Sequence, residues 1–362
     1  MKTCLVTGAA GHIGNTLVRT LVAKGYAVRA VVVEPAPHLE GLGVEIIRGD
    51  VRDPEGLREA FLGVDWVFHL AALISITGDD EAALYETNVK GTRNMAELAL
   101  ECGVGRFIHF SSVHGYSLFG GRAPIDEGSP SALGDCRAGL YDRSKALSER
   151  EVRQVAAAGL DVVIINPTGC IGPNDYGMSL MGEVFLRLYE GTLPAVVNGG
   201  FNWVDVRDVA EAAVELARKG SSGENYLIGG HWASIAQLAR HVEAITGRPA
   251  PGFICPYWLA YGVSPFVLAF SRWIRQRPFF TPEVIRTLRG NRVVSHQKVA
   301  HAVGYKPRPT AETIVDLFGW FKKEGHLNKR DPKEDLLRAV PIPIPMTGTE
   351  NSLASQGHGF VL

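Results

Sequence analysis

The first 25 residues constrain the fold more than any other part of the chain. The apolar run TCLVTG ends in a loop with three glycines, Gly8, Gly11 and Gly14, and HIGNTLVRTLVAKG follows with helical periodicity and a terminal glycine. A strand, a glycine loop and a helix in this order are typical of a dinucleotide-binding unit. The glycines allow a tight turn and let the backbone approach a pyrophosphate at the helix N-terminus. A simple tight turn is the alternative, but the position directly after the first strand favours a phosphate-binding loop.

Apolar runs then alternate with stretches of helical periodicity through the first half of the chain. The helical stretches include LREAFLG, a long one over about Ala82–Cys102, and one that carries Tyr141. Strands that alternate with helices predict an α/β fold with a Rossmann-type doubly wound parallel sheet and helices on both faces. The expected strands are TCLVTG, AVRAVVV, VEIIRGD, VDWVFHLAA, RFIHFSS and LDVVIINP.

The pattern loosens after Pro167. Short helical pieces around Met181–Glu190 and Val206–Lys219 alternate with isolated strand signals such as ENYLIGG, and the helical stretches SIAQLARHVEAITG and TAETIVDLFGWFKK follow. This looser pattern predicts a smaller, mixed α/β region that is wrapped onto the sheet.

We therefore expect three parts. A dinucleotide-binding Rossmann domain covers 1–170 and includes the helix of Tyr141. A mainly substrate-binding region covers 171–330, and some of its elements return to the Rossmann sheet. Residues 331–362 are rich in Pro, Ser and Gly, a composition that is typical of a flexible tail.

Composition excludes several classes of function. A formal net charge of −1 and the lack of a long basic run give no electrostatic footprint for nucleic acid. The cysteines are scattered without CxxC spacing, so neither a disulfide framework nor a zinc site is indicated, and we expect no metal. Glycines interrupt the apolar N-terminus, which does not fit a signal peptide, and a cytoplasmic location is expected. The cysteines are Cys4, Cys102, Cys136, Cys170 and Cys255.

One uncharged stretch complicates this interpretation. Residues 249–271 approach the length of a membrane span, but Pro251, Pro256 and Pro265 interrupt them. We expect a loop and short helices that cover an apolar substrate pocket, since the prolines argue against a continuous helix of spanning length. A surface that makes peripheral contact with a membrane is the alternative.

The end of the second expected strand bears on cofactor choice. An acid about 20 residues after a glycine loop binds the adenosine ribose hydroxyls, whereas an Arg there meets a 2′-phosphate. Glu34 follows the run VVV, and no Arg or Lys occurs until Arg48. Glu34 thus favours NAD(H) over NADP(H), although a solvated residue at a strand end is an equally simple interpretation.

A pair of residues near the middle of the chain raises the question of catalysis. In GLYDRSKALSER, Tyr141 and Lys145 are four residues apart and lie on one face of the expected helix. By itself the pair fits either a catalytic device or a solvated helix face.

Several ordered motifs together decide that question. With them the chain resembles the extended short-chain dehydrogenases/reductases of the NAD-dependent epimerase/dehydratase family over roughly residues 1–325. It resembles especially the branch with dihydroflavonol reductases, steroid dehydrogenase/isomerases and hopanoid-associated sugar epimerase-like proteins. The motifs are TGAAGHIG, GDVRD, HLAA, NVKGTRN, SS at Ser111–Ser112, YDRSK, NPTGCIGP and WVDVRDVA.

The resemblance implies roles for the matching residues. Ser112, Tyr141, Lys145 and Asn88 would form the catalytic group. Asp50 and Val51 would flank the adenine, and Pro167–Cys170 would pass beside the nicotinamide. The full expected cofactor site is Gly8, Ala10, Gly11, His12, Ile13, Gly14, Glu34, Asp50, Val51, Leu70, Ala71, Ala72, Tyr141, Lys145, Pro167, Thr168, Gly169 and Cys170.

The expected chemistry is proton transfer by Tyr141 during hydride transfer. A phenol has a pKa near 10, and a nearby ammonium such as that of Lys145, together with the positive nicotinamide ring, would lower the pKa. Ser112 would hydrogen-bond the reacting carbonyl or alcohol, with Ser111 as the competing serine. Because the catalytic residues are all present, an enzyme is favoured over a nucleotide-binding module. Val113, His114 and Tyr116 are candidate substrate contacts.

Two enzyme reactions remain open. Nucleotide-sugar relatives place an Arg just before the strand of WVDVRD, where this chain has Phe201 and Asn202. This difference, and an apolar segment with Trp258, Tyr261 and Phe266 that Trp273 and Phe279–Phe280 could extend, favour an NAD(P)-dependent oxidoreductase acting on an apolar small molecule. The alternative is a nucleotide-sugar epimerase or dehydratase that recycles its NAD. A homodimer is also implied.

Overall fold

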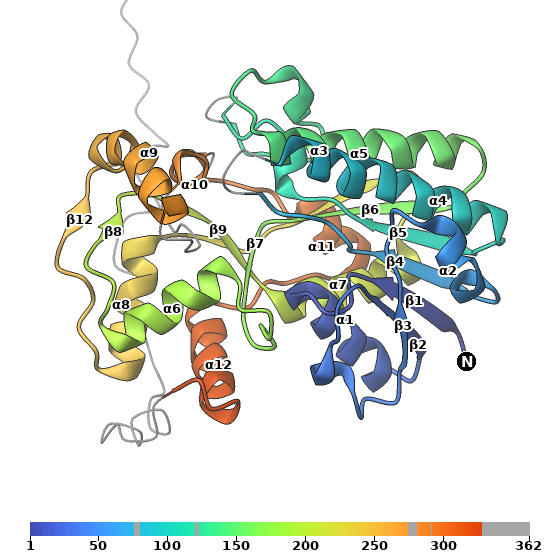
Figure 1. Cartoon of the computed structure of the whole chain (residues 1–362), viewed down its shortest axis with the longest axis horizontal. Helices are drawn as coiled ribbons and strands as arrows, with labels where there is room; N and C mark the ends of the chain where they lie inside the picture. The colour runs from blue at the N-terminus through green and yellow to red at the C-terminus, as the bar shows by residue number, and fades with distance from the viewer. Residues whose placement is uncertain (76–79, 120–122, 274–280, 291, 328–362) are drawn as a thin grey trace, which may run out of the picture.

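The structure is a computed structural model. It describes residues 1–75, 80–119, 123–273, 281–290 and 292–327. The tail predicted over 331–362 lies outside the described residues, which Figure 1 shows in colour.

Seven strands form one large sheet in the order β10-β6-β5-β4-β1-β2-β3, and every neighbouring pair is parallel. The central strands are mostly apolar, as expected of strands that helices cover on both faces. The predicted Rossmann-type doubly wound sheet is therefore confirmed. The strands are β1 (Thr3–Thr7), β2 (Ala27–Val32), β3 (Glu45–Arg48), β4 (Trp66–His69), β5 (Arg106–Phe110), β6 (Val162–Pro167) and β10 (Asn225–Ile228).

Helices cover both faces of this sheet (Figure 1). Helices α1, α7 and α11 pack together on one face, and α2, α4 and α5 pack on the other. Elements α7, α11 and β10 come from the second half of the chain. The helices are α1 (His12–Ala23), α2 (Pro54–Phe61), α4 (Gly91–Glu101), α5 (Leu140–Ala157), α7 (Val206–Lys219) and α11 (Gln297–Val303), with short 3₁₀ turns η1 (Pro37–Leu39), η3 (Val113–Gly115) and η4 (Ala132–Gly134).

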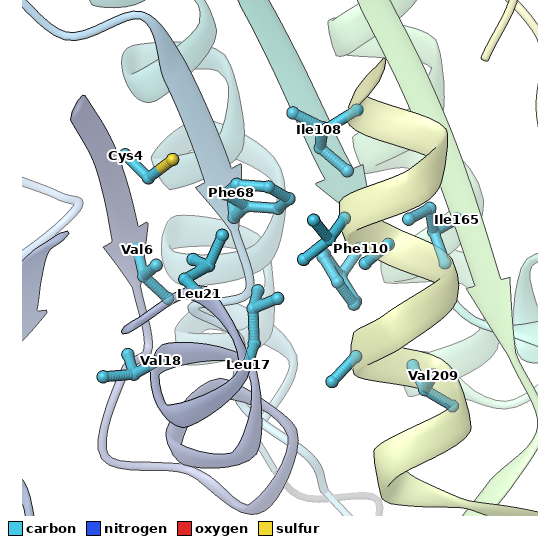
Figure 2. Close-up of a cluster of buried hydrophobic side chains, with 14 of the residues drawn as sticks. Cys4, Val6, Leu17, Val18, Leu21, Phe68, Ile108, Phe110, Ile165 and Val209 are labelled. Carbon is cyan, nitrogen blue, oxygen red and sulfur yellow. The ribbon is translucent and has the colours of Figure 1, made fainter. Parts of the chain in front are cut away.

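The core follows the two-residue period of the strands. Cys4 and Val6 of β1 point to the α1 side, where Figure 2 shows Val6 beside Val18 and Leu21 of α1. Leu5, between them in sequence, belongs to the cluster on the opposite face together with Phe61 of α2. The position of the first strand is therefore fixed by burial on both faces.

A smaller region carries its own core and two small sheets, in the orders β11-β9-β7 and β12-β8. Phe185, Phe318 and Phe321 are fully buried at its centre. Its elements are β7 (Gly169–Ile171), α6 (Leu180–Glu190), β8 (Val196–Val197), β9 (Gly200–Asp205), β11 (His231–Ser234), α8 (Ile235–Thr246), β12 (Ile254–Cys255), α9 (Tyr257–Trp273), α10 (Pro282–Thr287) and α12 (Thr310–Lys323).

The long helix expected over about Ala82–Cys102 is divided. It consists of α3 (Glu81–Leu84), a π-helical segment η2 (Tyr85–Lys90) and α4. A π-helical turn widens the helix and is frequent at functional sites. Here it contains Asn88, whose side chain is drawn into contacts described below.

The uncharged stretch does not form the expected loop with short helices. Pro251 and Pro256 precede α9, but α9 continues through Pro265 for 17 residues. A proline leaves the carbonyl four residues earlier without its helical N–H partner. That carbonyl belongs to Tyr261, and the Ser264 hydroxyl donates to it at 2.8 Å. No helix in the described ranges combines the length and apolarity needed to cross a membrane.

Candidate active site

Two neighbouring elements bring the expected catalytic residues together. Ser112 is the second residue after β5, and Tyr141 lies in the first turn of α5. The Asp142 carboxylate accepts a hydrogen bond from the backbone N–H of Gly139 at 2.9 Å, which caps the start of α5 and fixes the position of Tyr141. The Ser112 side chain lies close enough to the Tyr141 phenol to influence its pKa.

Burial controls the ionisation of Tyr141. It raises the pKa of the phenol above its ordinary value, while the nearby Ser112 hydroxyl acts in the opposite direction. Lys145 was expected to lower the pKa of Tyr141, but in the protein chain alone it does not. The Lys145 ammonium instead donates to the backbone carbonyl of Phe110 at 2.8 Å.

Lys145 is itself strongly affected by burial. Desolvation lowers the pKa of this side chain to about 8, and the negative charge of Glu149 opposes the change. An ammonium with this pKa is buried at a cost in stability at neutral pH.

This cost predicts the effect of replacing Lys145 by Met. Between pH 8 and the unfolded value of 10.5 the unfolded chain binds more protons, so wild-type stability rises with pH in this window. At pH 7 we expect Lys145→Met to raise the free energy of unfolding by about 2 kcal/mol, less than the full cost of the charge because the bond to Phe110 is lost. The gain should decline from pH 8 to 10.5 in thermal unfolding experiments.

Lys145→Arg is the matched control, because it keeps a positive charge at the buried position and should not stabilise the protein. A gain for Lys145→Met that persists unchanged above pH 10 would contradict the assignment.

The structure distinguishes the two adjacent serines. Ser112 Oγ accepts a hydrogen bond from the backbone N–H of His114 at 3.2 Å, in addition to its contact with Tyr141. Ser111 Oγ is buried and has no hydrogen-bond partner in the part of the chain that the structure describes. The geometry therefore brings Ser112, and not Ser111, to the tyrosine.

Asn88 joins three segments beneath the site. Its amide accepts from the backbone N–H of Leu73 at 2.7 Å and donates to the Leu73 carbonyl at 2.9 Å. It also donates to Ser144 Oγ on α5 at 3.0 Å. Asn88 thus connects the segment after β4 to the helix that carries Tyr141.

The glycine loop fits a dinucleotide. Gly8 has a positive φ of 68°, and a Cβ at Gly8 would lie 2.7 Å from the backbone nitrogen of Ala71. A Cβ at Gly14 would lie 2.2 Å from the Gly8 carbonyl oxygen, so α1 and the loop are in close contact. Gly11 differs because it is exposed and a Cβ there would meet only Gly8 O, at 3.4 Å. The loop is open in front of Gly11, where a pyrophosphate can approach.

Neighbouring segments of the expected cofactor site are held by hydrogen bonds. The backbone N–H groups of Leu70 and Ala71 both donate to Thr7 Oγ1 at 3.2 Å, which keeps the segment Leu70–Ala72 beside the glycine loop. His12 Nε2 lies 3.0 Å from the Pro173 carbonyl, so the start of α1 contacts the segment that follows β7. Ala10 and Ile13 pack against the core.

The adenine end carries charges of both signs. Glu34 is exposed just beyond β2, as expected. Arg48 ends β3, and its guanidinium donates to the Val33 carbonyl at 3.4 Å. Arg48 therefore lies close to Glu34, which their separation in the sequence did not indicate. Asp50 is paired with Arg52, which holds the pKa of its carboxyl below the usual value. Val51 is buried in the core beneath this end of the sheet.

The strand expected beside the nicotinamide continues β6. Pro167 and Thr168 are buried, and Gly169 lines the active-site cavity described next. Burial raises the pKa of the Cys170 thiol to about 12, which argues against a nucleophilic role.

An apolar cavity of about 240 Å³ opens at Tyr141. We call it the active-site cavity. Most of its lining is aliphatic or aromatic and comes from segments that are far apart in sequence. The apolar lining includes Leu180, Met181 and Val184 of α6, Leu193, Val196, Val197, Phe201, Trp203, Ile235, Val284 and Leu288.

Polar groups in this lining gather beside the tyrosine. His114 Nδ1 lies 2.7 Å from Asp142 Oδ1, and the His114 ring meets Tyr141 edge-on at a centroid distance of 5.5 Å. Phe201 stacks on the other side of His114 at 5.7 Å. Of the three candidate substrate contacts, the structure brings only His114 to the cavity. Val113 and Tyr116 are packed in a separate buried cluster with Leu227.

The apolar segment expected to line the pocket does not do so. Tyr261, Phe266 and Trp273 of α9 are exposed and are not part of the cavity wall. Phe279–Phe280 lie outside the described residues. The actual lining from α6 was missed, although its apolar residues at helical spacing give a signal that sequence reasoning could have used.

A second cavity of about 520 Å³ adjoins the first at Leu288. Trp258 lines it, together with Arg289 and Arg292. The two guanidinium groups lie over the rings of Tyr257 and Trp232, respectively. Asn202, which stands near the position expected for an Arg in nucleotide-sugar relatives, is instead buried and bonds to the backbone of Gly230.

A family model and two curated relatives match most of the chain. The family model described as "NAD dependent epimerase/dehydratase family" matches residues 4–229. Sterol demethylase protein B of Methylococcus capsulatus is 35% identical over 89% of this chain and 99% of its own length. A putative dihydroflavonol 4-reductase of Synechocystis sp. is 31% identical over 89% and 95%, respectively.

Solved structures share the fold. The crystal structure of gox2253 has a TM-score of 0.78 and 32% identity, and the match covers 91% of this chain and all of that one (100%). UDP-glucose 4-epimerase from Thermotoga maritima has a TM-score of 0.74 at 22% identity, covering 89% and 99%. Reductases and epimerases thus both occur among the proteins that this chain is similar to.

Proposed function

The chain belongs to the NAD-dependent epimerase/dehydratase family, in its extended short-chain dehydrogenase/reductase type, and we propose that it is an NAD(P)-dependent oxidoreductase. Its substrate would carry a carbonyl or secondary alcohol on an apolar body. The observation that carries the proposal is the active-site cavity, in which Tyr141 faces a mostly apolar lining.

The protein's own groups would move one proton in each turnover. Nicotinamide supplies or accepts the hydride at the reacting carbon. In reduction, Tyr141 Oη gives its proton to the carbonyl oxygen as that oxygen gains charge, and Ser112 Oγ donates a hydrogen bond to the same oxygen. In oxidation, Tyr141 accepts the proton. Lys145 would hold the nicotinamide ribose, and the loop of Gly8, Gly11 and Gly14 the pyrophosphate.

His114 would contact a second polar group of the substrate. With Nδ1 hydrogen-bonded to Asp142, the ring is oriented so that Nε2 can face the substrate. Since the rings of His114 and Tyr141 are 5.5 Å apart, this group would lie close to the reacting carbon.

Two features support an apolar substrate over a sugar nucleotide. Phe201 lines the active-site cavity where nucleotide-sugar relatives are expected to have a nearby Arg. In addition, the name of one relative described above, a sterol demethylase protein, refers to an apolar ring system.

A nucleotide-sugar epimerase is the second candidate, and one specific observation favours it. Arg289 and Arg292 line the adjoining cavity, where they could bind a diphosphate. In that reaction the nicotinamide would be reduced and reoxidised within one turnover, with no net consumption.

A cofactor-consumption assay separates the two candidates. The near-ultraviolet absorbance of NADH and NADPH would be followed with a sterol 3-ketone, with a small water-soluble ketone and with UDP-glucose, and sugar products would be analysed. We expect stoichiometric oxidation of the cofactor with the sterol ketone. Faster turnover with NADH would indicate that Glu34 governs cofactor selection, and faster turnover with NADPH would indicate Arg48. Conversion of the sugar nucleotide without net oxidation would establish the epimerase instead.

A further inference from the structure

Helix α9 exposes an apolar surface that neither cavity uses in full. Its large side chains are mostly solvent-exposed, and Trp258, Phe266 and Trp273 have 72%, 76% and 79% of their surface accessible. Ser264, Leu268 and Ser271 are the positions that face the protein. We define the α9 face as Trp258, Tyr261, Val263, Phe266, Phe270 and Trp273.

None of the six members of the α9 face is charged. At 100° per residue they cover an arc of about 200° along a helix about 25 Å long. Arg272, whose helical position falls within this arc, is the one charged residue between 249 and 273 in the sequence. Phe253 and Ile254, just before the helix, are also exposed and extend the apolar surface. An exposed apolar surface of this extent indicates an interaction site.

The chemistry at the edges of the face fits a lipid bilayer. Trp258 and Trp273 lie near its two ends, and tryptophan is enriched where a protein meets the interfacial region of a membrane. Arg289 and Arg292 are exposed beside Trp258, and in the described part of the chain neither forms an ion pair with a carboxylate. Such cations can meet the phosphates of anionic lipids.

The α9 face also lies close to the active-site cavity. Helix α9 packs on α10, and both lie at the end of the molecule remote from β1–β3 (Figure 1). Val284 and Thr287 of α10 line the active-site cavity, and Leu288 lines both cavities. Helix α9 is therefore connected to the active-site cavity through its neighbour α10.

We propose that the α9 face docks the protein on a bilayer that contains anionic lipids, with α9 lying in the plane of the interface. Docking would place the cavity entrance at the membrane, from which a lipid-soluble substrate could be taken. The uptake of substrate from the membrane rests on the proposed function, whereas the docking of the α9 face does not. Apolar burial supplies the binding energy, and the arginines add a dependence on lipid charge.

Vesicle flotation of the full chain tests the docking. Wild-type protein is expected to float with vesicles of phosphatidylcholine and phosphatidylglycerol, and more weakly with phosphatidylcholine alone. The double variant Phe266→Ser with Phe270→Ser should lower partitioning about 100-fold, roughly tenfold for each buried aromatic side chain. Arg289→Gln should lower it about fivefold, only on vesicles with phosphatidylglycerol.

Leu62→Ser is the matched control, because Leu62 is also 56% exposed, as Phe270 is, but follows α2 on the Rossmann side. It should leave flotation unchanged. Thermal unfolding and NAD(H) binding of the double variant should match those of wild type, which shows that the fold is intact.

Two results would overturn the proposal. One is wild-type protein that fails to float with either vesicle. The other is a concentration-dependent dimer, lost in the double variant, that would assign the α9 face to a second copy. The double variant should reduce a small water-soluble ketone as fast as wild type does. If wild type reduces no ketone but still floats, the proposed function fails and the docking stands.

Discussion

Replacing Tyr141 by Phe is expected to lower kcat for carbonyl reduction by about 10²–10⁴-fold, the range for loss of a positioned general acid. The variant keeps the ring that packs edge-on against His114 and loses only the hydroxyl near Ser112. Cofactor binding should therefore be preserved. Steady-state kinetics with the sterol ketone, together with titration of NADH by fluorescence, measures both quantities.

The two serines before η3 supply the matched comparison. Ser112→Ala removes the hydroxyl beside Tyr141 and should also lower kcat strongly. Ser111→Ala removes a buried hydroxyl that has no partner in the described part of the structure, so kcat should change little. Full turnover by Tyr141→Phe, or equal losses for the two serine variants, would contradict the mechanism.

Gly14→Ala is expected to have the second large effect, on folding. The new methyl group, at the start of α1, would lie 2.2 Å from the carbonyl oxygen of Gly8, which is a backbone atom of the preceding loop. We expect a loss of about 2–4 kcal/mol in the free energy of unfolding, because the loop and helix must separate. Urea unfolding followed by circular dichroism measures this loss.

Gly11→Ala separates the structural role from the cofactor role. Gly11 has φ of −72°, which any residue adopts, and its added methyl group would meet only Gly8 O, at 3.4 Å. Stability should change little. Affinity for NAD(H) should fall at least about tenfold, since the methyl group occupies the space through which a pyrophosphate approaches. Unchanged affinity would show that the cofactor does not bind at this loop.

Features set by neighbouring residues were predictable from the sequence. The strand TCLVTG, the glycine loop and the helix of Tyr141 depend on local periodicity and on a few turn residues, and the structure has them as expected. The continuity of α9 was not predictable from its prolines alone. It depends on the Ser264 hydroxyl, which takes the place of the N–H that Pro265 lacks.

Features that depend on convergence in space were beyond sequence reasoning. The active-site cavity is built from segments as distant as His114, Leu180 and Val284. Tyr116 is only four residues from Ser112, yet its side chain lies in a different buried cluster. Burial also set the pKa of Lys145, which no motif reports. The compartment and the homodimer stay predictions, because a single chain carries no direct record of either.

The large sheet is completed by a strand, β10, that the ribosome synthesises late. Strand β6 is buried along its whole length, and its outer neighbour is β10, which follows some 60 residues later in the chain. Helix α11, which packs on β10 and α7, comes later still. The first half therefore leaves the ribosome with an unpaired apolar strand edge. The two halves are not modules that could be exchanged by cutting at one point, and during synthesis the nascent chain depends on protection of that edge until its second half arrives.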